Sequence, residues 1–390
     1  MSETPFKIAI PDDRLALLQK KLELTIFPDE LEDVGRDYGT PLADVKRLVA
    51  HWRNGFDWRA QEAALNADLP QFTRDIDVEG HGTLNIHYVH MRSARPGAIP
   101  LCFVHGWPGS FIEARKLAPL LTESVDGQPS FHVVVLSLPG YGFSEQPRQR
   151  GFGIPQYGEV ANKLMLALGY DTYVTQGGDW GSAITRYMAT AYGQKHVKAW
   201  HTNMPVSFGP EDPSVKLSAE EQEQAKKALV WREKESAYMR LQATKPQTLG
   251  YGMSDSPAGL LAWIFEKLVS WTDHYPWTDD EVLTWISIYW FSRAGPTASF
   301  RIYYEVFGAA PKQPLEKSPI PLGTTILPGE IIISPKPLRD LLGNIVYEGI
   351  HDKGGHFAAY EVPSTLAEDL LKMFAKGGPA YGVVEGKDGY

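Results

Sequence analysis

A heptapeptide near the middle of the chain, QGGDWGS at 176–182, constrains the fold more than any other segment. It follows a short apolar run at 172–175 that is typical of a buried strand, and it precedes a helical pattern at 183–192. The glycines two residues before and after Asp179 supply the room that a sharp strand-to-helix turn requires. Such a turn exposes its central side chain above a sheet. The motif therefore predicts an α/β fold with Asp179 at the apex of the turn.

The remainder of the chain fits a sheet that is interrupted by a helical insert. Short apolar runs alternate with segments whose apolar residues have helical spacing, which is the pattern of strands joined by crossover helices. Between about 205 and 314 the chain instead shows consecutive helical patterns rich in Trp and Tyr. The expected strands are 72–78, 83–90, 100–104, 131–138, 172–175, 197–201, 324–327 and 345–348, and the expected helices outside the insert are 12–22, 41–52, 155–168, 183–192 and 363–374.

We therefore expect four parts in the chain. They are an N-terminal extension at 1–95 that wraps the core, a first part of the core at 96–204, a helical cap insert at 205–314, and a second part of the core at 315–390. The glycine-rich tail after Lys376 is expected to fray or to lie on the surface.

Composition and charge exclude several classes of protein. The 390 residues carry 38 Lys and Arg against 47 Asp and Glu, a formal charge of -9 without a basic cluster, so we expect no nucleic-acid partner. The single cysteine, Cys102, forbids an internal disulfide and disfavours a structural zinc site. His81, His87 and His90 favour no metal either, because strand alternation puts His87 and His90 on opposite faces. Without a membrane-length apolar run or a signal-peptide pattern, we expect a soluble, cytoplasmic protein.

Asp179 occupies the position at which such a turn usually carries a serine nucleophile. An aspartate has an ordinary pKa of about 3.9, so its carboxylate is ionised at neutral pH and needs no base to become nucleophilic. Attack on an ester or amide would give a reactive anhydride, whereas attack on saturated carbon gives an ordinary alkyl ester. The motif thus indicates displacement at an sp3 carbon. Taken alone, it fits equally well an aspartate that caps the helix at 183–192.

HGWPGS at 105–110 follows the expected strand at 100–104 and forms a second element of the site. Its glycines allow the backbone N–H of Trp107 to point toward the site, although a simple tight turn is the alternative. Together with the N–H of Trp180, it would form an oxyanion hole of two donors.

GGHF at 354–357 places His356 after the last expected strand. Nucleophile, acid and then histidine is the chain order of hydrolases built on such sheets. For the acid we favour Glu330, just past the strand at 324–327. Asp352, which is nearer in sequence, and Glu348 are the alternatives.

With this constellation the chain resembles the epoxide hydrolases of the α/β-hydrolase fold, specifically the microsomal-type branch with an N-terminal extension. The matching segments fall in order along nearly the whole chain. They are HGWPGSF at 105–111, QGGDWGS at 176–182, residues 244–250 and 255–259 in the insert, SFRIYYE at 299–305, EIIISP at 330–335 and GGHFAAYE at 354–361. The resemblance implies an α/β-hydrolase sheet with an inserted helical cap and an N-terminal extension.

The resemblance also implies a role for each site residue. Asp179 is the nucleophile, His356 the base that activates water, and Glu330 its charge partner. Two tyrosines of the insert, Tyr238 and Tyr303, grip the epoxide oxygen, and the neighbouring Tyr304 is the alternative for the second. A phenol of ordinary pKa about 10 suits this role, because it can donate to a poor alkoxide leaving group while staying protonated at neutral pH.

We therefore expect an enzyme that converts epoxides to vicinal diols through a hydroxyalkyl ester on Asp179, with neither cofactor nor metal. Its 11 Trp and 18 Tyr suggest an aromatic-lined pocket, so the expected partners are a small apolar or aromatic epoxide and water. No membrane partner is expected, and a homodimer is compatible with the sequence.

Two other functions compete with this one. A haloalkane dehalogenase also uses a carboxylate nucleophile, and the Asp-Trp pair at 179–180 resembles its halide-binding arrangement. Those enzymes often have an asparagine for halide contact where this chain has Trp107, and they lack the long N-terminal segment. A catalytically silent protein that sequesters an apolar ligand in an aromatic pocket is the second alternative.

Overall fold

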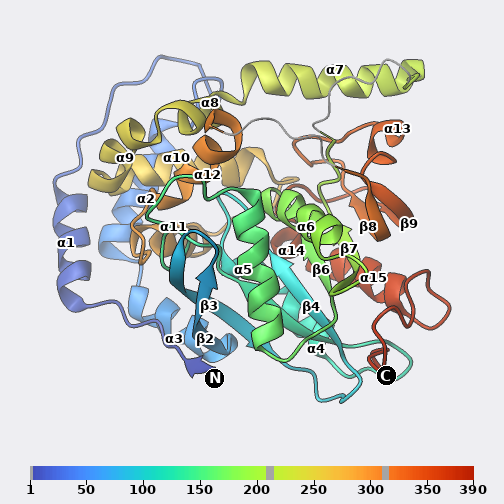
Figure 1. Ribbon diagram of the computed structural model, residues 1–390. Coiled ribbons are helices and arrows are strands. Elements are labelled where there is room, and N and C mark those ends of the chain that lie inside the picture. The colour runs from blue at the N-terminus through green and yellow to red at the C-terminus, as the bar shows by residue number, and fades with distance from the viewer. Residues whose placement is uncertain (1–2, 208–214, 310–315) are drawn as a thin grey trace.

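A mixed sheet of nine strands runs through the described residues, which are 3–207, 215–309 and 316–390 of the computed structural model (Figure 1). The strand order is β1-β2-β3-β5-β4-β6-β7-β8-β9. Strands β4 to β9 are parallel to one another, whereas β1, β2 and β3 pair antiparallel and join the sheet at β5. The strands are β1 (Thr4–Pro5), β2 (Gln71–Val78), β3 (Gly82–Met91), β4 (Ile99–Val104), β5 (Phe131–Leu136), β6 (Tyr173–Gly177), β7 (Val197–Thr202), β8 (Ser318–Ile326) and β9 (Gly343–Ile350).

Helices cover both faces of the parallel strands. Helices α5 (Ile154–Ala167) and α6 (Trp180–Ala191) pack against each other, and α4 (Leu117–Thr122) and α15 (Pro363–Phe374) form a second packed pair. Every residue of β4 is buried, as expected for a strand with helices on both sides, and its sequence IPLCFV is accordingly a continuous apolar run. The shorter helices η1 (Phe111–Arg115), α13 (Lys336–Arg339) and α14 (Ala358–Glu361) lie in the loops.

The helices between β7 and β8, here called the cap, form a separate layer beside the sheet (Figure 1). They are α7 (Ala219–Lys234), α8 (Ala237–Thr244), α9 (Pro246–Asp255), α10 (Pro257–Ser270), α11 (Asp279–Trp290), η2 (Ala298–Phe300), α12 (Arg301–Tyr303) and η3 (Tyr304–Ala309). Helices α10 and α11 are buried along much of their length, whereas α7 has no buried residue. Residue 314, the expected end of the insert, lies outside the described residues.

The N-terminal helices tie the cap to the sheet. Helix α2 (Leu42–Asn54) packs on α10 and α11, α1 (Asp12–Glu23) on α10, and α3 (Trp58–Asp68) on α11, while β2 and β3 belong to the sheet.

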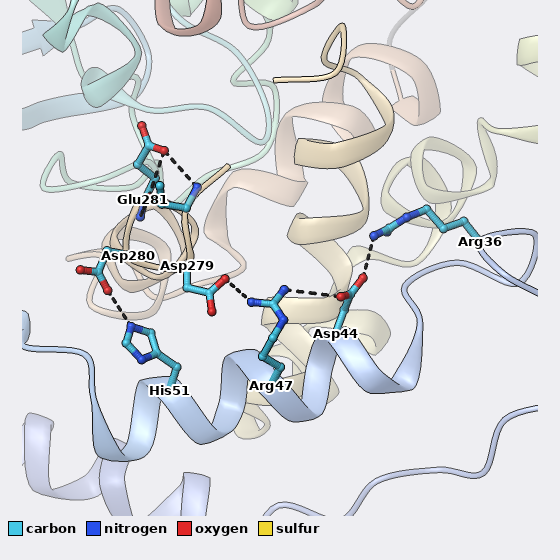
Figure 2. Close-up of polar contacts among 8 residues, drawn as sticks. Arg36, Asp44, Arg47, His51, Asp279, Asp280 and Glu281 are labelled. Carbon is cyan, nitrogen blue, oxygen red and sulfur yellow. Dashed lines mark hydrogen bonds and ion pairs between the residues drawn. The ribbon is translucent and has the colours of Figure 1, made fainter. Parts of the chain in front are cut away.

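An ion pair and a polar histidine contact strengthen the packing of α2 on α11 (Figure 2). Arg47 of α2 pairs with Asp279, and Nε2 of His51 lies 2.7 Å from Oδ1 of Asp280. Both aspartates stand in the first turn of α11, where the helix dipole favours negative charge. The cap is therefore held by charge as well as by apolar packing.

Most expected elements are present with ends shifted by a few residues, and three differences have physical reasons. Helix α3 was not predicted, because its few buried residues make a weak periodic pattern. Strand β8 begins at Ser318 instead of 324, since Pro319 and Pro321 argue against a strand, and the ladder is indeed irregular there. The tail after Lys376 lies largely on the surface, as one of the two expected alternatives had it, but it is not frayed, because Val384 is buried and the Gly389 carbonyl accepts a hydrogen bond from the Ser130 N–H at 2.9 Å.

Across the three described ranges, no helix combines the length and the apolar character that crossing a lipid bilayer demands.

The start of α6 lies directly against the backbone of β4. A Cβ atom added to Gly181 would overlap the carbonyl group of Val104, which is backbone and cannot turn away. By contrast, a Cβ added to Gly252, in the exposed middle of α9, would meet no atom within 4 Å. These two helical glycines form a matched pair for testing the close approach.

Gly181→Ala should lower the free energy of unfolding by about 1–3 kcal/mol, because overpacking against rigid backbone forces the helix away from the sheet. Gly252→Ala should raise it by about 0.5–1 kcal/mol through helix propensity. Chemical denaturation monitored by circular dichroism measures both changes. Equal midpoints for the two variants would contradict the close packing of α6 on β4.

Candidate active site

Asp179 occupies a strained turn between β6 and α6. Its backbone has φ 51° and ψ -127°, a left-handed conformation that costs a non-glycine residue of order 1–3 kcal/mol. The turn is tight: a Cβ on Gly177 would meet the backbone of Gly181, and a Cβ on Gly106 would collide with the Asp179 side chain. The three glycines therefore allow the carboxylate to stand above the carboxyl ends of β4 and β6.

The carboxylate of Asp179 is held by a backbone donor and faces a histidine. The Trp107 N–H donates to Oδ1 at 2.8 Å, and Nε2 of His356 lies 3.5 Å from Oδ2. The side chain keeps 15% of its surface accessible, so it is not sealed in the core. Trp180, the other expected donor, begins α6, but within the described part of the chain its N–H makes no hydrogen bond to this carboxylate.

His356 is paired with Glu330, as the sequence predicted for the acid. Nδ1 of His356 lies 2.7 Å from Oε1 of Glu330, and both residues are buried. The N–H of Ile331 also donates to Oε1, at 2.8 Å. The alternatives lie elsewhere: Glu348 pairs with a buried arginine, and Asp352 is exposed on the loop.

The charges around His356 decide its protonation state. Burial by itself disfavours a charged imidazole, but the carboxylates of Glu330 and Asp179 outweigh it and hold the pKa of His356 well above its ordinary value. The imidazole is therefore protonated at neutral pH.

The two expected tyrosines of the cap belong to an aromatic cluster around Trp107, the residue whose N–H holds Asp179. The ring of Tyr238, from α8, stacks on Trp107 with centroids 5.1 Å apart, and its centroid lies 5.9 Å from that of Tyr303, from α12. Trp271 and Trp180 complete the cluster, with centroids 5.3 Å from Tyr238 and 4.8 Å from Tyr303, respectively. The expected aromatic surroundings of the site are thus present.

Burial, and then the negative charge of Asp179, raise the pKa of Tyr238 well above its ordinary value. Burial also dominates for Tyr303, whose pKa is likewise raised by Tyr238 and Asp179. Both phenols are therefore protonated and able to donate. Tyr304 begins the π-helical turn η3, is only half-buried, and belongs to none of these ring pairs.

Sequence reasoning missed two residues of the site. Trp271, at the end of α10, accepts a hydrogen bond from the His356 N–H at 2.8 Å and packs its ring against the imidazole. Glu113, in η1, lines the same small cavity as Asp179 and His356. The only sequence signal for Trp271 was the high content of aromatic residues in the insert. For Glu113, the signal could have been its position just after the HGWPGS motif.

Among the residues that the structure describes, no three His, Cys, Asp or Glu side chains are grouped so that they could hold a metal ion.

The sequence of the chain matches two known protein families. Residues 3–114 match the family described as the epoxide hydrolase N terminus, and residues 99–248 match the α/β-hydrolase fold. A putative epoxide hydrolase from Stigmatella aurantiaca is 38% identical, over 95% of this chain and 84% of that protein. Epoxide hydrolase 1 from Sus scrofa is 35% identical, over 95% and 88%.

A solved structure is also similar along nearly the whole chain. The epoxide hydrolase of Aspergillus niger superposes with a TM-score of 0.84 at 34% identity, covering 95% of each chain. The sheet, the inserted cap and the N-terminal extension are therefore those of the expected fold. This chain belongs to the epoxide hydrolase family of α/β-hydrolase fold enzymes.

Proposed function

We propose that this chain hydrolyses epoxides to vicinal diols, with Asp179 as the nucleophile and His356 as the base that later activates water. The observation that carries the proposal is the grouping around one carboxylate of a charged histidine–glutamate pair and two protonated phenols. The family of the chain supports the same reaction.

The first step is opening of the ring. An oxygen of Asp179 bonds to one epoxide carbon from the back, the carbon–oxygen bond breaks, and its electron pair goes to the departing oxygen. Tyr238 and Tyr303 donate hydrogen bonds to that oxygen, and one of the two phenols passes its proton to it, so that it becomes a hydroxyl group instead of an alkoxide. The product is a hydroxyalkyl ester on Asp179.

Ester formation also prepares the second step. Alkylation converts the Asp179 carboxylate to a neutral ester, so His356 loses one of the two negative charges that hold its pKa high. The imidazole can then release its proton, which in net balance restores the phenol that gave one to the epoxide oxygen, and act as a base toward water. Glu330 keeps it in the required tautomer. The N–H of Trp107 stabilises the oxyanion as water adds to the ester carbonyl, with that of Trp180 as the proposed second donor.

The surroundings of Asp179 favour a small apolar or aromatic epoxide over a haloalkane. A halide leaves without a proton and needs N–H donors, whereas two buried phenols close to the nucleophile suit an oxygen leaving group. The aromatic rings of Trp107, Trp180 and Trp271 offer apolar contact to a substituent on the ring.

A single turnover in oxygen-18 water should place the label in Asp179, because the new diol oxygen comes from the carboxylate and water attacks the ester carbonyl. Mass spectrometry of the peptide that contains residue 179 and of the first-cycle diol measures this directly. Asp179→Asn, the control, should form no diol before it deamidates. Label in the first-cycle diol would mean direct attack of water on the epoxide.

Glu330→Gln should slow steady-state turnover by roughly 10²- to 10⁴-fold, because the imidazole loses the partner that orients it and stabilises its charge. The ester should accumulate, since ring opening does not require the base. Asp352→Asn, which changes the exposed acid on the histidine loop, is the control and should turn over as the wild type does. If Asp352→Asn lost activity while Glu330→Gln did not, the partner of His356 would be Asp352 instead of Glu330.

Tyr238→Phe and Tyr303→Phe should each slow ring opening by about 10- to 100-fold, the loss expected for one hydrogen bond to a developing charge. Tyr304→Phe is the matched control and should stay within about twofold, since its ring lies outside the cluster. Stopped-flow fluorescence of the aromatic cluster can follow ring opening. An effect of the Tyr304 variant that exceeds that of Tyr303 would exchange their roles.

A further inference from the structure

A small cavity lies beside the proposed nucleophile. Its walls include Asp179, His356, Glu113 and the glycines at 106 and 109. Its volume is about 10 Å³, close to the roughly 10–15 Å³ that one water molecule needs. The cavity therefore has room for a single water at the place where the ester carbonyl and the imidazole meet.

Glu113 is built into this cavity by the loop that also holds Trp107. The backbone of Ser110 and Gly106 lies close enough to its carboxyl group to offset part of the rise in its pKa. A Cβ on Gly109 would coincide with the Glu113 carboxyl oxygen, so the loop leaves space for this side chain. Glu113 lies deep in the protein but keeps some accessible surface. That surface can face the cavity that the residue lines.

The carboxyl group can both donate and accept. Burial raises the pKa of Glu113 to about 8; the charge of His356 lowers it and that of Asp179 raises it. At neutral pH the group is therefore mostly a neutral acid, with one O–H donor and free acceptor positions. A neutral acid also avoids a further negative charge beside Asp179 and Glu330.

We propose that Glu113 holds the hydrolytic water in this cavity, between the imidazole of His356 and the carboxyl carbon of Asp179. This role deepens the proposed function and rests on it. An ordered water needs sufficient volume and at least two polar partners. The cavity has room for one water, and Glu113 and His356 are its hydrogen-bond partners.

The step is balanced without a proton from Glu113. His356 takes one proton from the water, and the remaining hydroxide oxygen bonds to the carboxyl carbon of the Asp179 ester. The carbonyl electron pair moves to the oxygen held by Trp107 and then returns, breaking the bond to the alkyl oxygen. That oxygen takes the proton from His356 and leaves as the diol hydroxyl. The new carboxylic acid of Asp179 then passes its proton to His356, which restores the starting state, while Glu113 keeps its hydrogen bond to the oxygen that came from the water until the ester is cleaved.

A purely structural role for Glu113 predicts a different outcome. If the carboxyl group only braced the 106–110 loop, its loss would displace the Trp107 N–H and slow ring opening as well as hydrolysis. If it positions water, its loss affects hydrolysis alone. The two chemical steps therefore separate the two roles.

The test uses Glu113→Leu and the conservative Glu113→Gln in the full-length protein, mixed with styrene oxide and quenched over one turnover. Mass spectrometry follows the ester on the peptide that contains Asp179. We expect Glu113→Leu to slow ester hydrolysis by about 10- to 100-fold, with ring opening within a few-fold, so that the ester accumulates. Glu113→Gln, which keeps a donor and an acceptor, should recover most of the rate.

Glu62→Gln is the control, because Glu62 is a buried carboxyl of α3 in the N-terminal extension, away from the cavity. It should leave the ratio of the rates of ring opening and ester hydrolysis unchanged, even if the free energy of unfolding falls.

Equal slowing of both steps in Glu113→Leu, or hydrolysis at the wild-type rate, would overturn the proposal while leaving the proposed function intact. Diol formation by the wild type without any trapped ester would overturn the covalent route and the role of Glu113 together. If the leucine variant does not fold, a high-resolution crystal structure of the wild type decides the question. An ordered water within hydrogen-bond distance of Glu113 supports the proposal, and a dry cavity overturns it.

Discussion

The pairing of one buried imidazole with two carboxylates is the interaction on which the rest of the site depends. Burial opposes charge on His356, and the protonated state persists because Glu330 and Asp179 lie on its two ring nitrogens. Carboxylate oxygens inside a protein are costly in free energy unless hydrogen-bond donors satisfy them. The N–H groups of Trp107 and Ile331 supply two such donors. The loops after β4 and β8 are therefore part of the electrostatics of the site.

The sheet and the cap contribute different groups. The proposed nucleophile, base and acid follow parallel strands, whose carboxyl ends lie at one edge of the sheet, as is usual for sites on open α/β sheets. The phenols of Tyr238 and Tyr303, and the carbonyl that fixes His356, come from the cap. The site is complete only when the cap packs on the sheet. The N-terminal helices assist that packing through the ion pair of Arg47 and the polar contact of His51 with α11.

A site residue could be predicted where its motif consists of consecutive residues, and not where its role depends on contacts between distant segments. Asp179 was predictable because the strand, the turn and the two flanking glycines are contiguous, and the strained φ of 51° follows from that local geometry. The preference for Glu330 over Glu348 and Asp352 agrees with the 2.7 Å contact to His356, although three acids near that strand were candidates. Tyr303 and Tyr304 could not be separated by spacing, since neighbouring helical residues differ mainly in direction. The attachment of the tail could not be predicted for a similar reason, because the partner of Gly389 is the distant Ser130.

By itself, the sequence determined the α/β class, the position of the insert, and a carboxylate suited to attack saturated carbon, because these depend on periodicity and on residues within one turn of each other. Only the tertiary structure decided which acid meets the histidine, that Tyr238 and Tyr303 share one aromatic cluster, and that Glu113 shares a cavity with both Asp179 and His356. Those relations join segments far apart in the chain. Their distances are set by packing of the loops, the cap and the sheet, which no local pattern contains.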